Sequence, residues 1–279
     1  MPSTRENTIH VLERISLVID AMAASDEPLT LSVLSETTGL PLTTAHRLLH
    51  SLLKAGLVVQ PRRGRWALGI RFFELGRHVH DRIEIRRPAV PVMKALQEKT
   101  GLRILLSVPH DDKMLIIEEM LPASMTPLDS RLGEGAPMHL VASGKLFLST
   151  YDPTELRAYA TRTQLSSSTP NSLKGMDDLL VRIGRIREYG WAVGREEWRP
   201  GILCAAAPIY EHKEMVAALA IETMAAYPEE PAPDIPPTYI EWLRESAKTI
   251  SHALDAVGSK PKSSKKTDPR TLAAMSAGD

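Results

Sequence analysis

The chain has 279 residues with 34 basic and 34 acidic side chains, so its formal net charge at pH 7 is zero. Hydrophobic residues make up 43% of it, yet no apolar run reaches the roughly 18 residues of a membrane span. This excludes an integral membrane protein, and the length predicts about two domains. The single Cys204 excludes an internal disulfide and, with no export signal expected, favours a cytoplasmic protein.

The first half of the chain begins with the pattern of three helices. Apolar residues at helical spacing predict a first helix over residues 8–24. The spacing resumes from Leu31 to Thr38, Gly39 is a natural helix stop, and Pro41 suits the start of the next helix. The apolar stripe of that next helix comprises Ala45, Leu48, Leu49 and Leu52. A helix, a tight turn and a second helix in this order predict a helix-turn-helix.

The face opposite this stripe is polar. It comprises Thr43, Thr44, His46, Arg47, His50, Ser51 and Lys54. From Pro41 to Arg65 there are five Lys or Arg residues and no Asp or Glu, a local positive charge in a neutral chain. In the major groove Arg can bind guanine with two hydrogen bonds, and Thr can contact a thymine methyl group or a phosphate. The alternative is a small helical core with a solvated charged surface.

After Gly56 the apolar period becomes two, which predicts a hairpin, or wing, beside the second helix. Leu57 and Val59 fall on one side of it, and Trp66 and Leu68 follow after a basic tip. We expect Thr43, Thr44, His46 and Arg47 near base edges. Phosphate contacts are expected from Thr30, Ser32, His50, Ser51, Lys54, Arg62, Arg63 and Arg65.

Residues 70–86 mix apolar and charged side chains and predict a connecting helix whose surface suits dimer contacts. His78 and His80 point to different faces of that helix, so we expect solvated side chains and no metal. A further helix is predicted from Pro88 to about Thr100, closed by Gly101.

The second half alternates strands and helices. Strands are predicted over residues 103–108, 113–120, 202–210 and 215–223, with a turn at 110–112. Helices are predicted over residues 143–150, 153–161, 173–189 and 237–257. A mixed sheet with helices segregated around it predicts an α+β module. Residues 258–279 have no apolar period and are expected to be disordered.

Two segments of the second half are more specific than composition. One runs from Arg131 to Leu148 and contains Pro-Met-His followed by Ala-Ser-Gly-Lys; the other runs from Ile186 to Glu222 and contains Tyr-Gly and Arg-Glu-Glu. With the helix-turn-helix and wing they make the chain resemble the IclR family of bacterial transcriptional regulators over residues 8–257. The resemblance implies a winged-helix domain (1–69), a linker helix (70–87) and a GAF-like effector-binding domain (88–257), assembled as dimers or dimers of dimers.

The resemblance also implies an effector pocket between the Ser-Gly-Lys segment and the two late strands. The matching positions are Ala142, Ser143, Gly194 or Arg195, Cys204, Ala220 and Glu222. The alternation of these strands gathers small side chains on one sheet face, which either a ligand or a closely packed helix must cover. Free amides where Ser143 and Gly144 open a helix favour an anion such as a carboxylate, although Ser143 can equally act as an N-cap.

The predicted pocket also contains a carboxylate, Glu222, and a thiol, Cys204. Glu222 departs from the small or hydroxyl residue that family members often have, and it would repel a plain carboxylate while accepting hydrogen bonds from a hydroxyl or amine. A phenolic or polyhydroxy acid would satisfy both ends of the pocket. Alternatively, Glu222 pairs with Arg195 or another cation and never meets the ligand. Cys204 lies among alanines without catalytic partners, so we expect a small buried hydrophobe.

The sequence thus predicts an effector-responsive, sequence-specific regulator that binds double-stranded operator DNA and a small organic acid, with no cofactor and no metal. A general likeness of the strand end at Glu222 to regulators of aromatic-acid pathways suggests control of a catabolic operon. Two alternatives stay open: an architectural DNA-binding protein without a ligand, and a small-molecule-binding enzyme, for which no acid–base pair or metal set is found.

Overall fold

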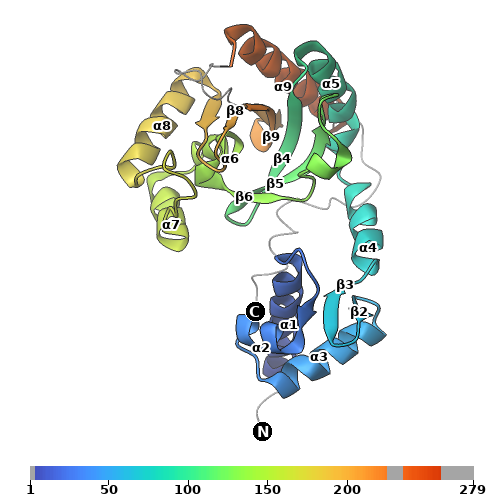
Figure 1. The fold of residues 1–279 in the computed structure, drawn as a ribbon. Helices are drawn as coiled ribbons and strands as arrows, with labels where there is room; N and C mark the ends of the chain where they lie inside the picture. Colours follow the sequence, from blue (N-terminus) through green and yellow to red (C-terminus); the bar gives the residue numbers. More distant parts are fainter. Residues whose placement is uncertain (1–3, 225–234, 259–279) are drawn as a thin grey trace. The chain divides into compact units, whose positions relative to one another are not determined.

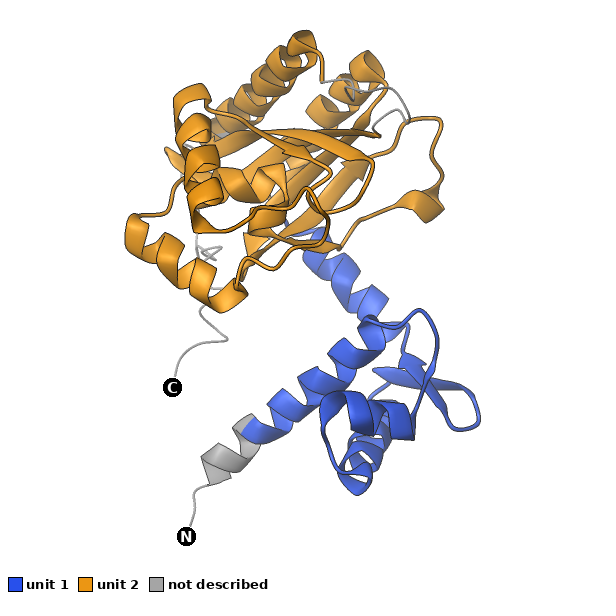
Figure 2. Ribbon diagram, turned by 60° about the vertical axis from the view of Figure 1, so that its left-hand side comes forward, with its two compact units in different colours: residues 1–83 blue, residues 84–279 orange. Residues whose placement is uncertain are grey.

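The computed structural model describes residues 4–224 and 235–258. The chain divides into two units, Met1–Ile83 and Glu84–Asp279 (Figure 2). The division falls inside the predicted linker of residues 70–87. The predicted disordered tail, apart from Gly258, lies outside the described residues. None of the described helices is both long and apolar enough to cross a membrane.

The first unit has three helices, a three-stranded antiparallel sheet and a fourth helix (Figure 1). The helices are α1 (Thr4–Ala23), α2 (Leu31–Thr38), α3 (Leu42–Lys54) and α4 (Arg71–His80). The strands are β1 (Leu29–Thr30), β2 (Val58–Arg62) and β3 (Arg65–Leu68), in the order β1-β3-β2. The predicted stop is confirmed, because Gly39 ends α2 with φ of 68°, a left-handed conformation that glycine adopts without strain.

The core of the first unit lies between α1, α2, α3 and the wing. It includes Val18, Leu34, Leu49 and Trp66. In β2 the inward side chain is Val58, which is fully buried, whereas Val59 is 40% exposed. Leu57 precedes the strand, in the turn after Gly56.

The predicted connecting helix ends early. α4 stops at His80, and α5 (Arg86–Thr100) begins two residues before the predicted start at Pro88. The earlier start is compatible with proline, because Pro88 lies in the first turn, where a backbone N–H has no partner within the helix. Gly101, with φ of 68°, ends α5 as predicted.

The second unit is built on a six-stranded sheet in the order β6-β5-β4-β9-β8-β7. Its strands are β4 (Arg103–His110), β5 (Lys113–Met120), β6 (Gly135–Pro137), β7 (Ala192–Arg195), β8 (Ile202–Glu211) and β9 (Glu214–Met224). Every pairing between them is antiparallel, which corrects the predicted mixed sheet. Short turns join β4 to β5 and β8 to β9, and such hairpins enforce antiparallel neighbours.

Helices cover both faces of this sheet. α5 and α9 (Pro237–Gly258) pack together against β4, β5 and β8 on one face. α6 (Ala142–Leu148) packs against β7, β8 and β9 on the other, with α8 (Met176–Tyr189) outside it (Figure 1). Two short 3₁₀ helices, η1 (Pro127–Asp129) and η2 (Met138–Leu140), and the helix α7 (Pro153–Thr163) complete the unit.

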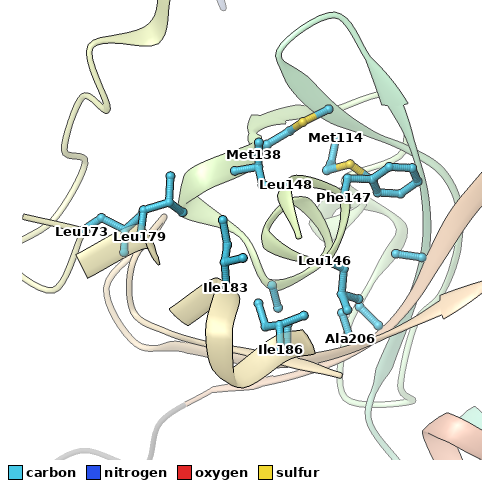
Figure 3. Packing of buried hydrophobic residues seen from close by; sticks show 14 of the residues in the cluster. Met114, Met138, Leu146, Phe147, Leu148, Leu173, Leu179, Ile183, Ile186 and Ala206 are labelled. Atoms are coloured by element: carbon cyan, nitrogen blue, oxygen red, sulfur yellow. The ribbon is translucent and has the colours of Figure 1, made fainter. Parts of the chain in front are cut away.

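The main core of the second unit surrounds α6. It includes Leu146 and Phe147 of α6, Met114 of β5, Ala206 of β8, and Ile183 and Ile186 of α8 (Figure 3). α6 is buried along its whole length, so it is the central helix of the unit rather than a surface one. Everything it carries, including its polar side chains, is therefore held in place by packing.

Candidate functional site

The polar face of α3 is exposed, as the sequence predicts. Seven predicted contact residues lie on this helix; six are exposed and Thr44 is half-buried. On the opposite side Ala45, Leu49 and Leu52 are buried and Leu48 is partly buried. The helix therefore separates a face that anchors it in the core from a face of hydroxyls, imidazoles and cations that is free to meet a partner.

Several of these polar side chains also bond to each other or to the backbone. Ser51 donates from Oγ to the Arg47 carbonyl oxygen at 3.0 Å. The Nε2 atoms of His46 and His50 lie 3.1 Å apart, and the His50 ring packs edge-on against Trp66 of the wing at 5.6 Å. The pairing of the two histidines is a feature that sequence analysis missed, although their spacing of four residues brings side chains together on a helix.

Of the predicted phosphate contacts outside α3, two are engaged within the unit, and Ser32 and the two arginines of the wing turn are exposed. Thr30 caps α2 by accepting from the Val33 backbone N–H at 3.3 Å, and Arg65 donates to the Pro28 carbonyl oxygen at 3.1 Å. These two side chains help to hold the unit together. Arg62 and Arg63 are exposed at the turn of the wing, where Gly64 has φ of 76°. Their guanidinium groups are the ones at the wing tip that suit a phosphate backbone.

The second unit contains a cavity of about 60 Å³ between the sheet, α6 and the loop after β7. Six of the eight predicted effector residues line it: Ala142, Ser143, Gly194, Cys204, Ala220 and Glu222. Gly144 and Arg195 do not line it. Ala220 belongs to the core around α6 as well, so on this sheet face a packed helix and a cavity coexist rather than exclude each other.

Gly144, which was predicted to bind the effector, has a packing role instead. A Cβ atom built there would lie 2.3 Å from the Cα and the carbonyl oxygen of Met138, so η2 and α6 meet where only glycine fits. The N-cap prediction for Ser143 is also wrong. The cap position is Val141, with no side-chain cap, because the helix begins one residue earlier than predicted.

Glu222 pairs with two arginines, neither of which is Arg195. Its Oε1 accepts from Arg103 at 3.3 Å, and its Oε2 accepts from Arg131 at 2.9 Å. Arg103 lies directly across the β4–β9 ladder from Glu222. Burial nevertheless raises the pKa of Glu222, and the two guanidinium groups oppose that rise. Arg195 itself is exposed. The predicted pairing of Glu222 with a cation is thus confirmed, with arginines other than Arg195, whereas its contact with an effector stays a prediction.

A second buried ion pair lies beside the cavity and was not predicted. The Lys145 Nζ of α6 donates to the Glu197 Oε1 at 2.5 Å, and Arg182 of α8 donates to the same oxygen at 3.0 Å. The side chains of Lys145 and Glu197 are each 1% exposed. Burial lowers the pKa of Lys145, and the Glu197 carboxylate opposes that shift. The sequence feature that could have predicted this pair is Lys145 itself, a cation beside the apolar residues that end at Leu148.

Two further groups complete the polar lining. Burial raises the pKa of Cys204 to about 11, so its thiol is protonated and unreactive near neutral pH. Ser107 of β4 is buried, and its Oγ has no hydrogen-bond partner among the described residues. Within the described part of the chain, no three or more His, Cys, Asp or Glu side chains are grouped to hold a metal ion.

Comparison with known proteins agrees with this architecture. The model of the IclR helix-turn-helix domain matches residues 11–62, and that of the bacterial transcriptional regulator IclR C-terminal domain matches residues 77–252. The chain is similar to the repressor AllR of Salmonella typhi, with 30% identity over 254 residues that cover 90% of this chain and 92% of AllR. It is 27% identical to the regulator XynR of Escherichia coli over 88% of this chain and 97% of XynR.

Among solved structures, an IclR homologue from Microbacterium hydrocarbonoxydans complexed with 4-hydroxybenzoate has the same fold. The TM-score is 0.72 at 21% identity, covering 88% of this chain and 99% of that one. Both matched domains belong to regulators rather than to enzymes, which removes the enzyme alternative. The chain therefore belongs to the IclR family of bacterial transcriptional regulators, with a DNA-binding helix-turn-helix domain and a C-terminal effector-binding domain.

Proposed function

We propose that the exposed face of α3 and the wing bind an operator sequence, and that a small organic acid in the cavity of the second unit controls this binding. The observation that supports the DNA contact most is charge. From Pro41 to Arg65 there are five cations and no acidic residue, and the predicted contacts on α3 face outward. Such a regulator would act in the cytoplasm, on a catabolic operon for that acid.

The size of the cavity supports a small effector rather than a phenolic one. At about 60 Å³ it has less than half the volume of the roughly 150 Å³ engineered cavity that accommodates benzene. The relative from Microbacterium hydrocarbonoxydans binds an aromatic acid, but that ligand would require this cavity to open. Arg131 and Arg199 line the cavity, where they pair with Glu222 and Glu134 respectively, and their remaining guanidinium N–H groups can donate to a ligand carboxylate. We therefore propose an aliphatic acid of three or four carbons.

Replacing Arg47 with alanine is expected to reduce discrimination between operator and random DNA by about 1–3 kcal/mol, because Arg47 is proposed to bind a guanine with two hydrogen bonds. Replacing Arg63 with alanine is expected to weaken binding to both DNAs alike and to lower the salt slope by about one, because Arg63 is proposed to contact a phosphate. Fluorescence anisotropy titrations at several salt concentrations measure both effects. If both substitutions weaken operator and random DNA equally, this assignment of contacts is wrong.

A second copy of the chain is the proposed partner for an apolar surface of the first unit, because paired α3 helices about 34 Å apart would read a pseudo-palindrome. On α4 and just before it, Ile70, Phe73 and Val79 are each more than half exposed, and α1 adds Leu12 at 62%. None of the residues of α4 is buried, and a helix that leaves its apolar side chains exposed favours association with a partner. The proposed assembly is a dimer, with a dimer of dimers as the higher form.

Replacing Phe73 with glutamate is expected to weaken dimerisation by about tenfold or more, because it places a charge in the proposed interface. Sedimentation velocity over a range of protein concentrations measures this. The matched control is Val181→Glu on α8, which is also exposed but lies in the second unit. Unchanged association of the Phe73 variant would contradict the proposed dimer surface.

A further inference from the structure

We propose that Glu197, rather than Glu222, reads the effector, and that the effector carries a hydroxyl or amino group that donates a hydrogen bond to the Glu197 Oε2. This inference rests on the proposed effector role of the cavity and narrows the class of its ligand. It concerns small hydroxy or amino acids, as opposed to acids with an apolar chain.

Glu222 is already paired with two arginines. Each of its carboxylate oxygens accepts from a guanidinium group, one from Arg103 and the other from Arg131. A ligand donor at Glu222 would have to share an oxygen with an arginine or displace one. Displacing an arginine would leave a buried charge without its partner, which costs more than one new hydrogen bond returns. Glu222 is therefore fitted to hold the cavity wall rather than to select the ligand.

Only one of the two carboxylate oxygens of Glu197 has hydrogen-bond partners among the described residues. Its Oε1 accepts from both Lys145 and Arg182, whereas its Oε2 is buried with no hydrogen-bond partner among the described residues. Glu197 is 2% exposed and lines the cavity. A buried acceptor on a carboxylate is costly to leave unpaired. A ligand O–H or N–H directed at this oxygen would remove that cost, whereas a carboxylate or methyl group would not.

A second residue of the cavity lining also has a polar atom without a hydrogen-bond partner among the described residues. Ser107 contributes an Oγ that is buried and unpartnered within the described part of the chain, and it lies on β4 rather than in the loop that carries Glu197. A hydroxyl can donate or accept, so Ser107 can donate to the oxygen of the ligand hydroxyl whose hydrogen is directed at Glu197. Unpaired polar atoms on two different elements favour a ligand that carries a hydroxyl group besides its carboxylate.

The test uses the full-length protein and matched compounds that differ by one donor. Isothermal titration calorimetry compares propionate with lactate and alanine, and butyrate with 3-hydroxybutyrate. We expect the hydroxylated or aminated compound to bind at least about tenfold more tightly than its parent, because only it satisfies the Glu197 Oε2. Equal affinities within each set, which would mean that water satisfies the oxygen, overturn the inference. Binding by none of these compounds also overturns it.

Two variants locate the effect. In Glu197→Gln the amide oxygen is expected to remain with Lys145 and Arg182, so an NH₂ group takes the place of the Oε2 acceptor and the preference for the donor compound is lost. Ser107→Ala leaves the ion pair intact and is expected to weaken the hydroxylated compounds severalfold while leaving the parents unchanged. The control is Ser167→Ala, at an exposed serine outside the cavity lining.

If Glu197→Gln does not fold, the wild-type comparison and Ser107→Ala decide the inference. Unchanged preferences in a folded Glu197→Gln, or in Ser107→Ala, contradict the assignment of that residue. Operator binding, measured by anisotropy on the same preparations, reports separately on the proposed function. A protein that binds its operator but responds equally to parent and hydroxylated acids would keep the function and lose this inference.

Discussion

Replacing Glu197 with alanine is expected to destabilise the second unit by about 3–5 kcal/mol, the cost of removing one partner from a buried ion pair. Lys145 would then be left in α6 with a side chain that is 1% exposed and no carboxylate beside it. Arg182, which is half-buried, would lose the same oxygen. Since burial already lowers the pKa of Lys145, its ammonium would deprotonate or the helix would have to move.

Chemical denaturation of the full chain measures this loss, followed through the fluorescence of Trp191, Trp198 and Trp242, which all lie in the second unit. The matched control is the double substitution Glu197→Leu with Lys145→Met. It removes both charges and is expected to recover most of the stability, because apolar replacements of a buried ion pair are often neutral. A single variant as stable as the wild type would show that Lys145 has another way to be satisfied.

Replacing Gly144 with alanine is expected to cost about 3 kcal/mol, at the upper end for overpacking a core. The added Cβ would lie 2.3 Å from the Cα of Met138, and backbone cannot yield as a side chain can. η2 and α6 would have to separate, and α6 supplies two residues of the cavity lining, Ala142 and Ser143. Effector binding should therefore weaken together with stability.

The control for this substitution is Gly184→Ala, in the interior of α8, where a Cβ would have no neighbour within 4 Å. It is expected to stabilise the chain by about 0.5–1 kcal/mol, because alanine loses less conformational entropy than glycine in a helix. Melting curves of the two variants should therefore shift in opposite directions. Equal shifts would contradict the close contact between η2 and α6.

Local patterns were enough to predict the DNA-binding unit. The helical spacing of Ala45, Leu49 and Leu52 determines which face of α3 is buried, and the stop at Gly39 follows from its backbone freedom. The period of two after Gly56 predicts the wing, but it does not reveal that Leu57 precedes the strand or which side of β2 faces the core. Short strands such as β6 and β7 were missed, since three or four residues are too few for an alternation pattern.

The polar interior of the effector unit was not predictable in the same way. Glu222 meets Arg131, which is 91 residues away along the chain, and Lys145 meets Glu197, which is 52 residues away. Those pairings depend on strand order and on how α6 packs into the sheet, neither of which a single sequence specifies. Strand alternation gathered small side chains on one sheet face, but only the resemblance to a family placed Cys204, Ala220 and Glu222 in one cavity with the segment at Ser143. It also placed Gly144 there, where a backbone contact requires glycine for a different reason.

The central claim, that this chain reads a specific operator through α3, is tested most directly by selecting binding sites from a random DNA duplex library with the full-length protein. Sequencing of the selected duplexes is expected to show a pseudo-palindrome whose half-sites are about one helical turn, or a multiple of it, apart. The Arg47→Ala variant is expected to lose information at defined positions of each half-site. Retention of DNA on the protein without any enriched sequence would contradict the claim.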